Sequence, residues 1–218
     1  MSKNNITSII FVLNKERELF MKKRYLSLLL LGVGALSLSS CGYGEISLEE
    51  FKTQLTANSK KEAPGFTSGT IKSEIKNYKF ECSNTDLGKI IEGTMSAALK
   101  VSLAAAGFNI DKNYDLSKGF SESRNLSNEE FKSATSIRYS GETIVEEIET
   151  SAKFYKSGDS LKISQKEEDE GEKMETSLYF DEYGYATGKE SSILMESKKG
   201  EDSFKISLYA SSFISFSK

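Results

Sequence analysis

Three short segments carry residues whose types and spacing could do chemistry. Ser73 and Lys76 have the Ser-x-x-Lys spacing of a serine nucleophile with a lysine base, and Gly184 to Glu190 partly matches a phosphate-binding loop. The acidic run 167–172 could bind a divalent cation through adjacent carboxylates. The 218-residue chain contains no histidine, which removes histidine bases, His-activated nucleophiles and His-ligated zinc.

None of the three segments predicts a catalytic or metal site. Ser73 and Lys76 lie in a strand-like pattern, where residues three apart point to opposite faces, and no Ser-Asp-Asn or Lys-Thr-Gly triplet accompanies them. The segment from Gly184 is one residue too short for a phosphate loop, and Glu190 replaces the required Ser or Thr. Adjacent carboxylates at a hairpin tip are typical of a solvated edge. We therefore expect no catalytic residue, no metal and no cofactor, and the chain is not predicted to be an enzyme.

The charge balance argues against a nucleic-acid partner. The whole chain has a net charge of -3. Residues 1–40 hold six basic and two acidic side chains, which leaves 23 basic and 30 acidic ones and a net charge of -7 for the rest. Nucleic-acid binding needs a concentrated basic surface, and an acidic domain does not supply one.

The strongest signal in the sequence lies at residues 21–40. Lys22, Lys23 and Arg24 form a basic segment directly after Met21. An uncharged apolar run follows from Leu26 to Leu38, which is shorter than the roughly 20 residues of a transmembrane helix. A basic segment, a short apolar core and small residues before a break indicate a secretory signal peptide.

The break has the sequence Leu38-Ser39-Ser40-Cys41, which resembles the lipobox of bacterial lipoproteins. The resemblance implies that Leu38, Ser39 and Ser40 are recognised by the signal peptidase and that Cys41 carries the lipid. It also implies a membrane anchor of at least two acyl chains on the extracytoplasmic side of a bacterial membrane. The outer leaflet of a cytoplasmic membrane and an outer membrane remain equal alternatives.

The remaining chain divides into a tether and one domain. Residues 1–20 are either a long n-region of the signal peptide or the result of a start codon assigned too early. We expect residues 41–45 to be the lipidated tether and residues 46–218 to form a single domain. Once Cys41 is lipidated, Cys82 has no partner for a disulfide, and its strand pattern predicts a buried thiol.

Helix-start signals and alternation predict the elements of this domain. Two segments with capping-box spacing, at Ser47 and Ser127, predict helices over 47–61 and from residue 127. A longer helix is expected over 84–107. About six strands are expected within 70–82 and 144–216, with a bulge or turn near residues 76–77, although 143–150 also fits a helix.

These elements predict an α+β fold, in which a curved antiparallel meander of about six strands has one face covered by two or three helices. The 84–107 helix is the expected cover. Its polar residues Lys89, Glu92, Ser96 and Lys100 form one narrow stripe, and the rest of its surface is apolar or small. We therefore expect this helix to be buried on most sides.

In architecture alone, this order of elements resembles the half-barrel family of lipoprotein carriers. In that family helices close over a curved sheet, and lipid occupies the space between them. The resemblance implies a lipid-anchored carrier or sensor that binds a lipid or another apolar ligand. Six residues would lie near its cavity: Ile90, Val101, Leu103, Ile206, Leu208 and Ile214. Ordinary core packing of the same six residues is the alternative.

A second functional class fits the same sequence. The domain could be a structural or interaction module that presents strand edges or its acidic surface to another envelope protein, without a small-molecule ligand. The short tether, the net charge of -7 and the charged hairpin tips favour this hypothesis.

Overall fold

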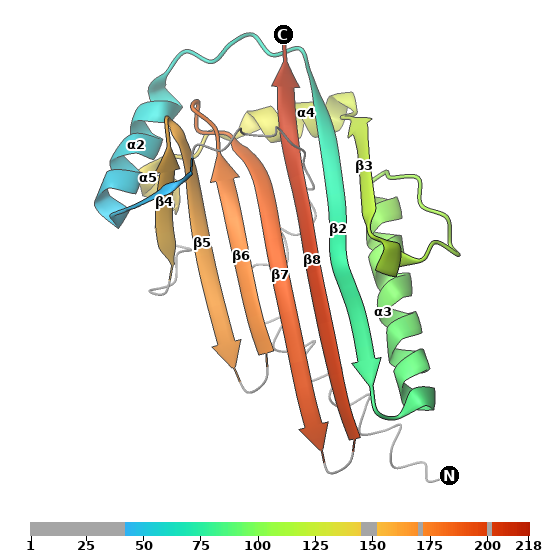
Figure 1. Ribbon diagram of the computed structural model, residues 1–218. Coiled ribbons are helices and arrows are strands. Elements are labelled where there is room, and N and C mark those ends of the chain that lie inside the picture. The colour runs from blue at the N-terminus through green and yellow to red at the C-terminus, as the bar shows by residue number, and fades with distance from the viewer. Residues whose placement is uncertain (1–41, 145–151, 170–171, 200–201) are drawn as a thin grey trace. The chain divides into compact units, whose positions relative to one another are not determined.

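The computed structural model describes residues 42–144, 152–169, 172–199 and 202–218 (Figure 1). Its helices are α2 (Leu48–Lys60), α3 (Thr85–Ala105), α4 (Asn128–Ser136) and α5 (Gly141–Ile144), with a 3-10 turn, η2 (Leu116–Lys118). Its strands are β1 (Gly44–Ile46), β2 (Ser68–Cys82), β3 (Phe120–Asn125), β4 (Lys153–Ser157), β5 (Ser160–Asp169), β6 (Glu172–Phe180), β7 (Ala186–Lys199) and β8 (Asp202–Ser217).

One antiparallel sheet contains all eight strands, in the order β1-β4-β5-β6-β7-β8-β2-β3. Strands β4 to β8 form the predicted meander, and β8 then pairs with β2 from the start of the domain. The edge strands β1 and β3 do not pair with each other, so the curved sheet stays open. The predicted α+β class and curved antiparallel sheet are confirmed, with eight strands and four α-helices in place of six and two or three.

Local sequence signals explain where α2 and α4 begin. The Ser47 hydroxyl accepts a hydrogen bond from the Glu50 N–H at 3.1 Å. At α4 the capping box is complete, because Ser127 and Glu130 each accept from the backbone N–H of the other. Such caps satisfy N–H groups that have no partner inside the helix. The predicted helix starts are confirmed.

Strand β2 contains the predicted irregularity. Its pairing with β8 changes register between Lys76 and Lys79, and Asn77 has a φ of 56°. Asparagine tolerates this left-handed conformation better than most residues. The bulge lets Ile75 and Tyr78 both be buried although they are three residues apart.

Two apolar clusters lie on one face of the sheet. The α2 cluster is formed by α2 and α5 against β4, β5 and β6, and contains Phe51, Leu55, Ile144, Phe154, Leu161, Ile163 and Phe180. The α3 cluster is formed by α3, η2 and the connecting loops against β2, β3 and β8, and contains Ile71, Ile75, Tyr78, Leu103, Phe108, Leu116, Phe120 and Leu208. Burial of these side chains provides the main drive for folding.

Strand register shows that both clusters share this face. Residues paired directly across antiparallel strands point the same way. Ile163 of the α2 cluster pairs with Leu178, and the row continues through Lys189 and Ser212 to Ser73. In β2, Ile71, Ser73 and Ile75 alternate with more exposed residues and are all buried, so their side chains point to the same face. Phe216, which α4 contacts through Phe131, has the same parity as Ser212.

We call this the helix face and the opposite one the open face, since no described helix packs on the latter. Figure 1 views the sheet from the open face, with α4 behind β8 and β2.

Helix α3 is less buried than predicted. Leu103 is buried against the sheet, but Ile90 and Val101 are each 67% exposed. The reason is that one side of α3, with Leu99 and Leu103, packs at the β2–β3 side of the sheet, together with Ala106 directly after the helix. Nothing among the described residues covers its outer side. The expectation that α3 is buried on most sides was wrong.

Two smaller predictions need correction, and one open alternative is decided for Ile144. Gly44 and Glu45, assigned to the tether, pair with β4 as part of strand β1 (Gly44–Ile46). For residues 143–150 both a strand and a helix were left open; Ile144 belongs to α5, and residues 145–151 lie outside the described chain. Part of the acidic run is paired strand rather than hairpin tip, because β5 extends to Asp169 and pairs there with Glu172. Glu167 and Glu168 are adjacent in β5 and therefore point to opposite faces, so they do not converge on one point.

Candidate functional site

A group of aromatic and charged side chains lies on the open face of the sheet. One row across five strands runs from Tyr155 through Lys162, Tyr179 and Gly188 to Phe213. Tyr43 packs against this row from the segment before β1. Glu190 of β7 and Tyr209 of β8 lie on the same face, where they pair across the strands with Ser211 and Ser192, respectively. We call the seven side chains the open-face cluster: Tyr43, Tyr155, Lys162, Tyr179, Glu190, Tyr209 and Phe213.

Tyr179 is the centre of the open-face cluster. Its ring lies 5.9 Å from the ring of Tyr43, edge to face, and 5.0 Å from that of Phe213. The Lys162 amine lies over two rings at once, 5.5 Å from the centroid of Tyr155 and 5.4 Å from that of Tyr179. Such aromatic and cation–π contacts each contribute about 0.5–1.5 kcal/mol, so the cluster is held in a defined arrangement.

Gly188 makes the contact between Tyr179 and Phe213 possible. It separates them in the cross-strand row, and the Phe213 ring lies over its backbone. A Cβ at position 188 would lie only 2.1 Å from Cδ1 of Phe213. Any larger residue would push the ring aside, so the absence of a side chain is what brings the two rings together.

Glu190 fixes the orientation of two tyrosines. The Tyr179 hydroxyl donates to Glu190 Oε2 at 2.6 Å, and the Tyr209 hydroxyl donates to Oε1 at 2.9 Å. Partial burial, followed by the bond to Glu190, raises the pKa of Tyr209 to about 12 and that of Tyr179 further. Both hydroxyls therefore stay protonated and remain hydrogen-bond donors at neutral pH.

All seven side chains of the open-face cluster are half-buried, and they cover one another rather than lying under a helix. The cluster therefore offers ring edges, a lysine amine and tyrosine hydroxyls on a surface preformed by its own contacts. Tyrosine and phenylalanine are enriched at protein interfaces, where they bury much area at little cost in side-chain entropy. This arrangement suits binding.

The sequence contains a signal for this cluster beyond the alternation of apolar and polar residues that predicted the strands. Alternation correctly assigns Leu178, Phe180 and Leu208 to the covered face. Tyr179 and Tyr209 then fall on the other parity, where polar residues are expected. Aromatic residues placed repeatedly on the polar parity of neighbouring strands could have predicted a binding face.

The predicted lipidation segment lies outside the described residues. Leu38, Ser39, Ser40 and Cys41 precede residue 42, where the description begins. Tyr43 follows Cys41 by two residues in sequence, and its ring contacts the ring of Tyr179. Tyr43 is therefore the member of the open-face cluster that lies nearest in sequence to the predicted lipidation site.

The six residues predicted to lie near a cavity are not brought together. Leu103 and Leu208 belong to the α3 cluster. Ile206 and Ile214 are buried on the helix face of β8, and Ile90 and Val101 are exposed on the outer side of α3. Four of the six therefore contribute to core packing, and the two exposed ones do not point toward the sheet.

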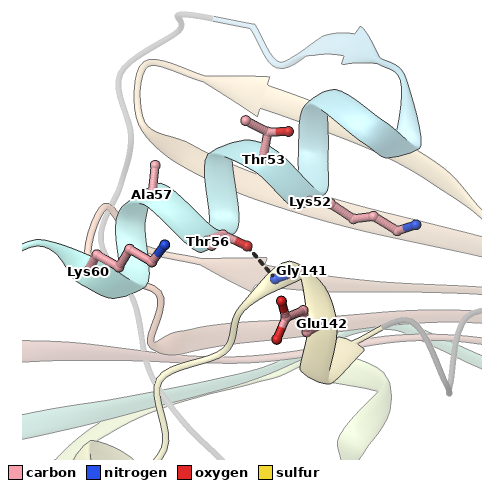
Figure 2. Close-up of a pocket in the computed structure, with 7 residues that line it drawn as sticks. All are labelled: Lys52, Thr53, Thr56, Ala57, Lys60, Gly141 and Glu142. Atoms are coloured by element: carbon pink, nitrogen blue, oxygen red, sulfur yellow. Dashed lines mark hydrogen bonds between the residues drawn. The ribbon is translucent and has the colours of Figure 1, made fainter.

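A surface hollow of about 820 Å³ lies between α2 and α5, wide open to solvent. Figure 2 shows its lining residues: Lys52, Thr53, Thr56, Ala57, Lys60, Gly141 and Glu142. Thr56 Oγ1 accepts a hydrogen bond from the Gly141 N–H at 3.0 Å, which joins the two helices. A Cβ at Gly141 would meet the Lys52 backbone, so glycine permits this close approach. The hollow contains none of the residues that the sequence singled out.

The two other segments considered for chemistry have structural roles. Ser73 is buried on the helix face, whereas the Lys76 amine forms an ion pair with Glu74 at 2.5 Å on the open face. The two side chains thus point to opposite faces, as predicted. Gly184, with a φ of 83°, lies in the turn between β6 and β7, which confirms a hairpin in place of a phosphate loop.

Comparison of the chain with protein-family models, curated proteins and solved structures found no match. Within the described residues, no helix combines the length and the apolar character that crossing a membrane requires.

Proposed function

We propose that this chain is a lipid-anchored, extracytoplasmic bacterial protein that binds another protein of the cell envelope through its open-face cluster. The open-face cluster is the observation that carries this proposal. It gathers four tyrosines, a phenylalanine and a lysine from β4 to β8 and from the segment before β1. No catalytic role is proposed for any of these residues.

The anchor half of the proposal rests on the order of signals from Met21 to Cys41. A basic segment, an apolar core and Leu38-Ser39-Ser40-Cys41 follow one another directly. Two or three acyl chains on Cys41 would hold the protein on the bilayer without a membrane-spanning helix. Strand β1 begins at Gly44, so little free chain separates the domain from the bilayer.

The binding half of the proposal rests on the chemistry of the open face. Rings held by Glu190 and Gly188 lose little entropy when a partner covers them, and preorganised aromatic residues are frequent hot spots. Charged pairs such as Lys72 with Glu74 and Lys166 with Glu175 lie on the same face. Such a polar surround is typical of the rim of a protein interface.

The anchor is tested by Cys41→Ala. Metabolic labelling with a palmitate analogue should mark the wild-type protein, and the variant should lose both the label and its retention on membranes. Retention of the unlabelled variant through residues 21–40 would show that cleavage after Ser40 does not occur and would contradict this half of the proposal.

The binding face is tested by photo-crosslinking in cells. A benzoylphenylalanine is placed at Ser192, which is exposed on the open face beside Tyr209. A matched protein carries it at Glu49, which is exposed on α2. We expect a discrete crosslinked protein from position 192 and none from position 49. Equal crosslinking from both positions, or crosslinks to lipid alone, would contradict a protein partner on the open face.

The carrier hypothesis remains the second candidate function. It is favoured by one feature of the helix face, where the two apolar clusters are separated by hydroxyl groups and a lysine rather than joined into one core. A native mass spectrum of the domain purified without detergent would decide it, because a bound lipid adds its mass and an empty protein does not.

A further inference from the structure

A polar seam separates the α2 cluster from the α3 cluster on the helix face. Five side chains of β2, β6, β7 and β8 form it, and we call them the seam: Ser73, Thr176, Lys189, Ser191 and Ser212. Their strands pair as Leu178–Lys189–Ser212–Ser73 in one row and Thr176–Ser191–Ala210 in the next. Leu178 packs against the α2 cluster and Ala210 against the α3 cluster, so the seam runs between two apolar surfaces.

Two hydroxyls of the seam are paired with each other. Ser73 is only 5% exposed, and its Oγ lies 2.5 Å from Oγ of Ser212. Either oxygen can be the donor. One hydroxyl hydrogen occupies this bond, so the second remains available for another acceptor. Since Ser212 is the more exposed of the two, that acceptor can approach from the solvent side.

Lys189 is the cation of the seam. It pairs directly with Leu178 on one side and Ser212 on the other, and burial alone lowers its pKa. Within the described chain, no carboxylate forms an ion pair with it. The acidic residue in its cross-strand row is Glu122, three strands away and therefore about 14 Å distant.

An ammonium that is half-buried and has no counter-ion among the described residues is unfavourable, because water is partly removed and no described carboxylate replaces it. An aliphatic residue at this point would join the two clusters into one core at no such cost. Hydroxyl groups at Ser191 and Thr176 extend the polar strip, and Lys189, Ser191 and Ser212 all keep partial exposure. The seam thus combines a cation, a free hydroxyl donor and access from solvent, with apolar side chains on both flanks.

We propose that the seam binds the anionic head of an amphiphilic ligand, a carboxylate or a phosphate, with Lys189 as its counter-ion and the Ser212 hydroxyl as a donor. The apolar part of the ligand contacts the flanking side chains, such as Leu178 and Ile214. This site needs neither the lipid anchor nor the open-face cluster. If the domain is a carrier, the second candidate function, this site is where it would bind the head group of its lipid.

The chemistry of the seam excludes two other ligand classes. A metal ion or an organic cation would be repelled by the lysine, and no carboxylate of the seam could hold it. A wholly apolar ligand would leave the Lys189 ammonium without a counter-ion and the second hydroxyl hydrogen of the Ser73–Ser212 pair without an acceptor. An anion with an apolar chain satisfies the ammonium, the hydroxyl and the flanking side chains together.

The test compares three short amphiphiles of equal chain length: octanoate, octyl phosphate and octan-1-ol. Each is titrated by calorimetry into the full chain held in lipid nanodiscs. Nanodiscs that hold the Lys189→Met protein serve as the reference. The amphiphile partitions into the lipid equally in both titrations, so this contribution cancels in the comparison. We expect both anions to bind the wild-type protein at least tenfold more tightly than the variant, and octan-1-ol to bind both equally.

Two further variants separate charge from folding. Lys189→Arg keeps a cation and should retain anion binding to within a few-fold, whereas Ser212→Ala should weaken it several-fold. The melting temperature of Lys189→Met should not fall, because the substitution removes a poorly solvated charge. If that variant fails to fold, the comparison of Ser212→Ala with Lys189→Arg carries the test.

The outcomes are distinct. A preference for octyl phosphate would assign a phosphate head group, and a preference for octanoate would assign a carboxylic acid. Equal affinity of the anions for wild type and Lys189→Met would overturn the proposal, and so would the absence of any anion binding to the wild-type protein. Neither result depends on a protein partner, and the wild-type and Lys189→Met proteins are held in the nanodiscs in the same way.

Discussion

Phe51 on the helix face and Tyr179 on the open face have similar ring contacts but different surroundings. Phe51 packs against Phe154 at 5.1 Å and Phe180 at 6.2 Å, and α2 carries it into full burial. Tyr179 packs against Tyr43 and Phe213 and remains half-buried. The comparison teaches that rings under a helix contribute mainly to stability, whereas rings that cover only one another remain available to a partner.

The largest effect should come from cutting a side chain under α2. Leu55 is 0% exposed, so Leu55→Ala should lower the free energy of unfolding by about 2–5 kcal/mol through lost burial and the cavity that it leaves. The matched control is Leu194→Ala on the open face, where Leu194 is half-buried. Urea unfolding should show a loss of less than about 1.5 kcal/mol for the control. Equal losses would remove the distinction between the faces.

A smaller effect is expected from adding a side chain under the Phe213 ring. Gly188→Ala should cost about 1–3 kcal/mol, because the new Cβ forces that ring to move. The near-ultraviolet circular dichroism of the tyrosines should change with it. Gly65→Ala is the control, since a Cβ there meets nothing within 4 Å. An unchanged spectrum and stability for Gly188→Ala would show that the ring is not held as described.

Removal of the Tyr179 hydroxyl tests whether the hydrogen bonds to Glu190 stabilise the fold. Tyr179→Phe keeps the ring and deletes the donor to Glu190 Oε2, which should cost about 1 kcal/mol. Tyr155→Phe is the control, because no hydrogen bond of the Tyr155 hydroxyl is found in the described part of the chain. Thermal unfolding should separate the two variants, and equal melting temperatures would argue against the Glu190 network.

The smallest effect is a pH dependence on the open face. Hydrogen bonds from Lys72 and then Lys76 lower the pKa of Glu74 to about 2. Because the folded pKa lies below the unfolded one, near 4.3, this stabilisation is complete above that value and is lost as pH falls toward 2. The exposed lysines limit it to about 1 kcal/mol. Glu74→Gln should flatten the acid limb of the stability curve, and an identical limb would contradict the assignment.

The sequence predicted elements that carry their own signals. The caps at Ser47 and Ser127 located α2 and α4, and the long alternation of residues 204–216 located β8. Strands β1 and β3 were missed because Gly44–Ile46 is too short to alternate and Phe120–Asn125 contains a single apolar residue. Such strands form because a neighbouring strand offers unpaired backbone groups, which sequence alone does not reveal.

The outward side of α3 and the open-face cluster were missed for a related reason. Periodicity shows that α3 is apolar, but it does not show how much sheet lies beneath the helix. With one side on the α3 cluster, Ile90 and Val101 are left exposed. Tyr179 and Phe213 likewise needed strand register, because they meet only across Gly188. Contacts between distant segments decide both features.

The most direct test of the open face as the binding surface is the affinity of the crosslinked partner, once purified, for Tyr179→Ala. That substitution removes the ring that Tyr43, Lys162 and Phe213 all contact. Tyr114→Ala, at a 37% exposed position outside the cluster, is the control. The account predicts that Tyr179→Ala weakens binding at least tenfold while Tyr114→Ala leaves it unchanged. Full affinity in a folded Tyr179→Ala protein would contradict it.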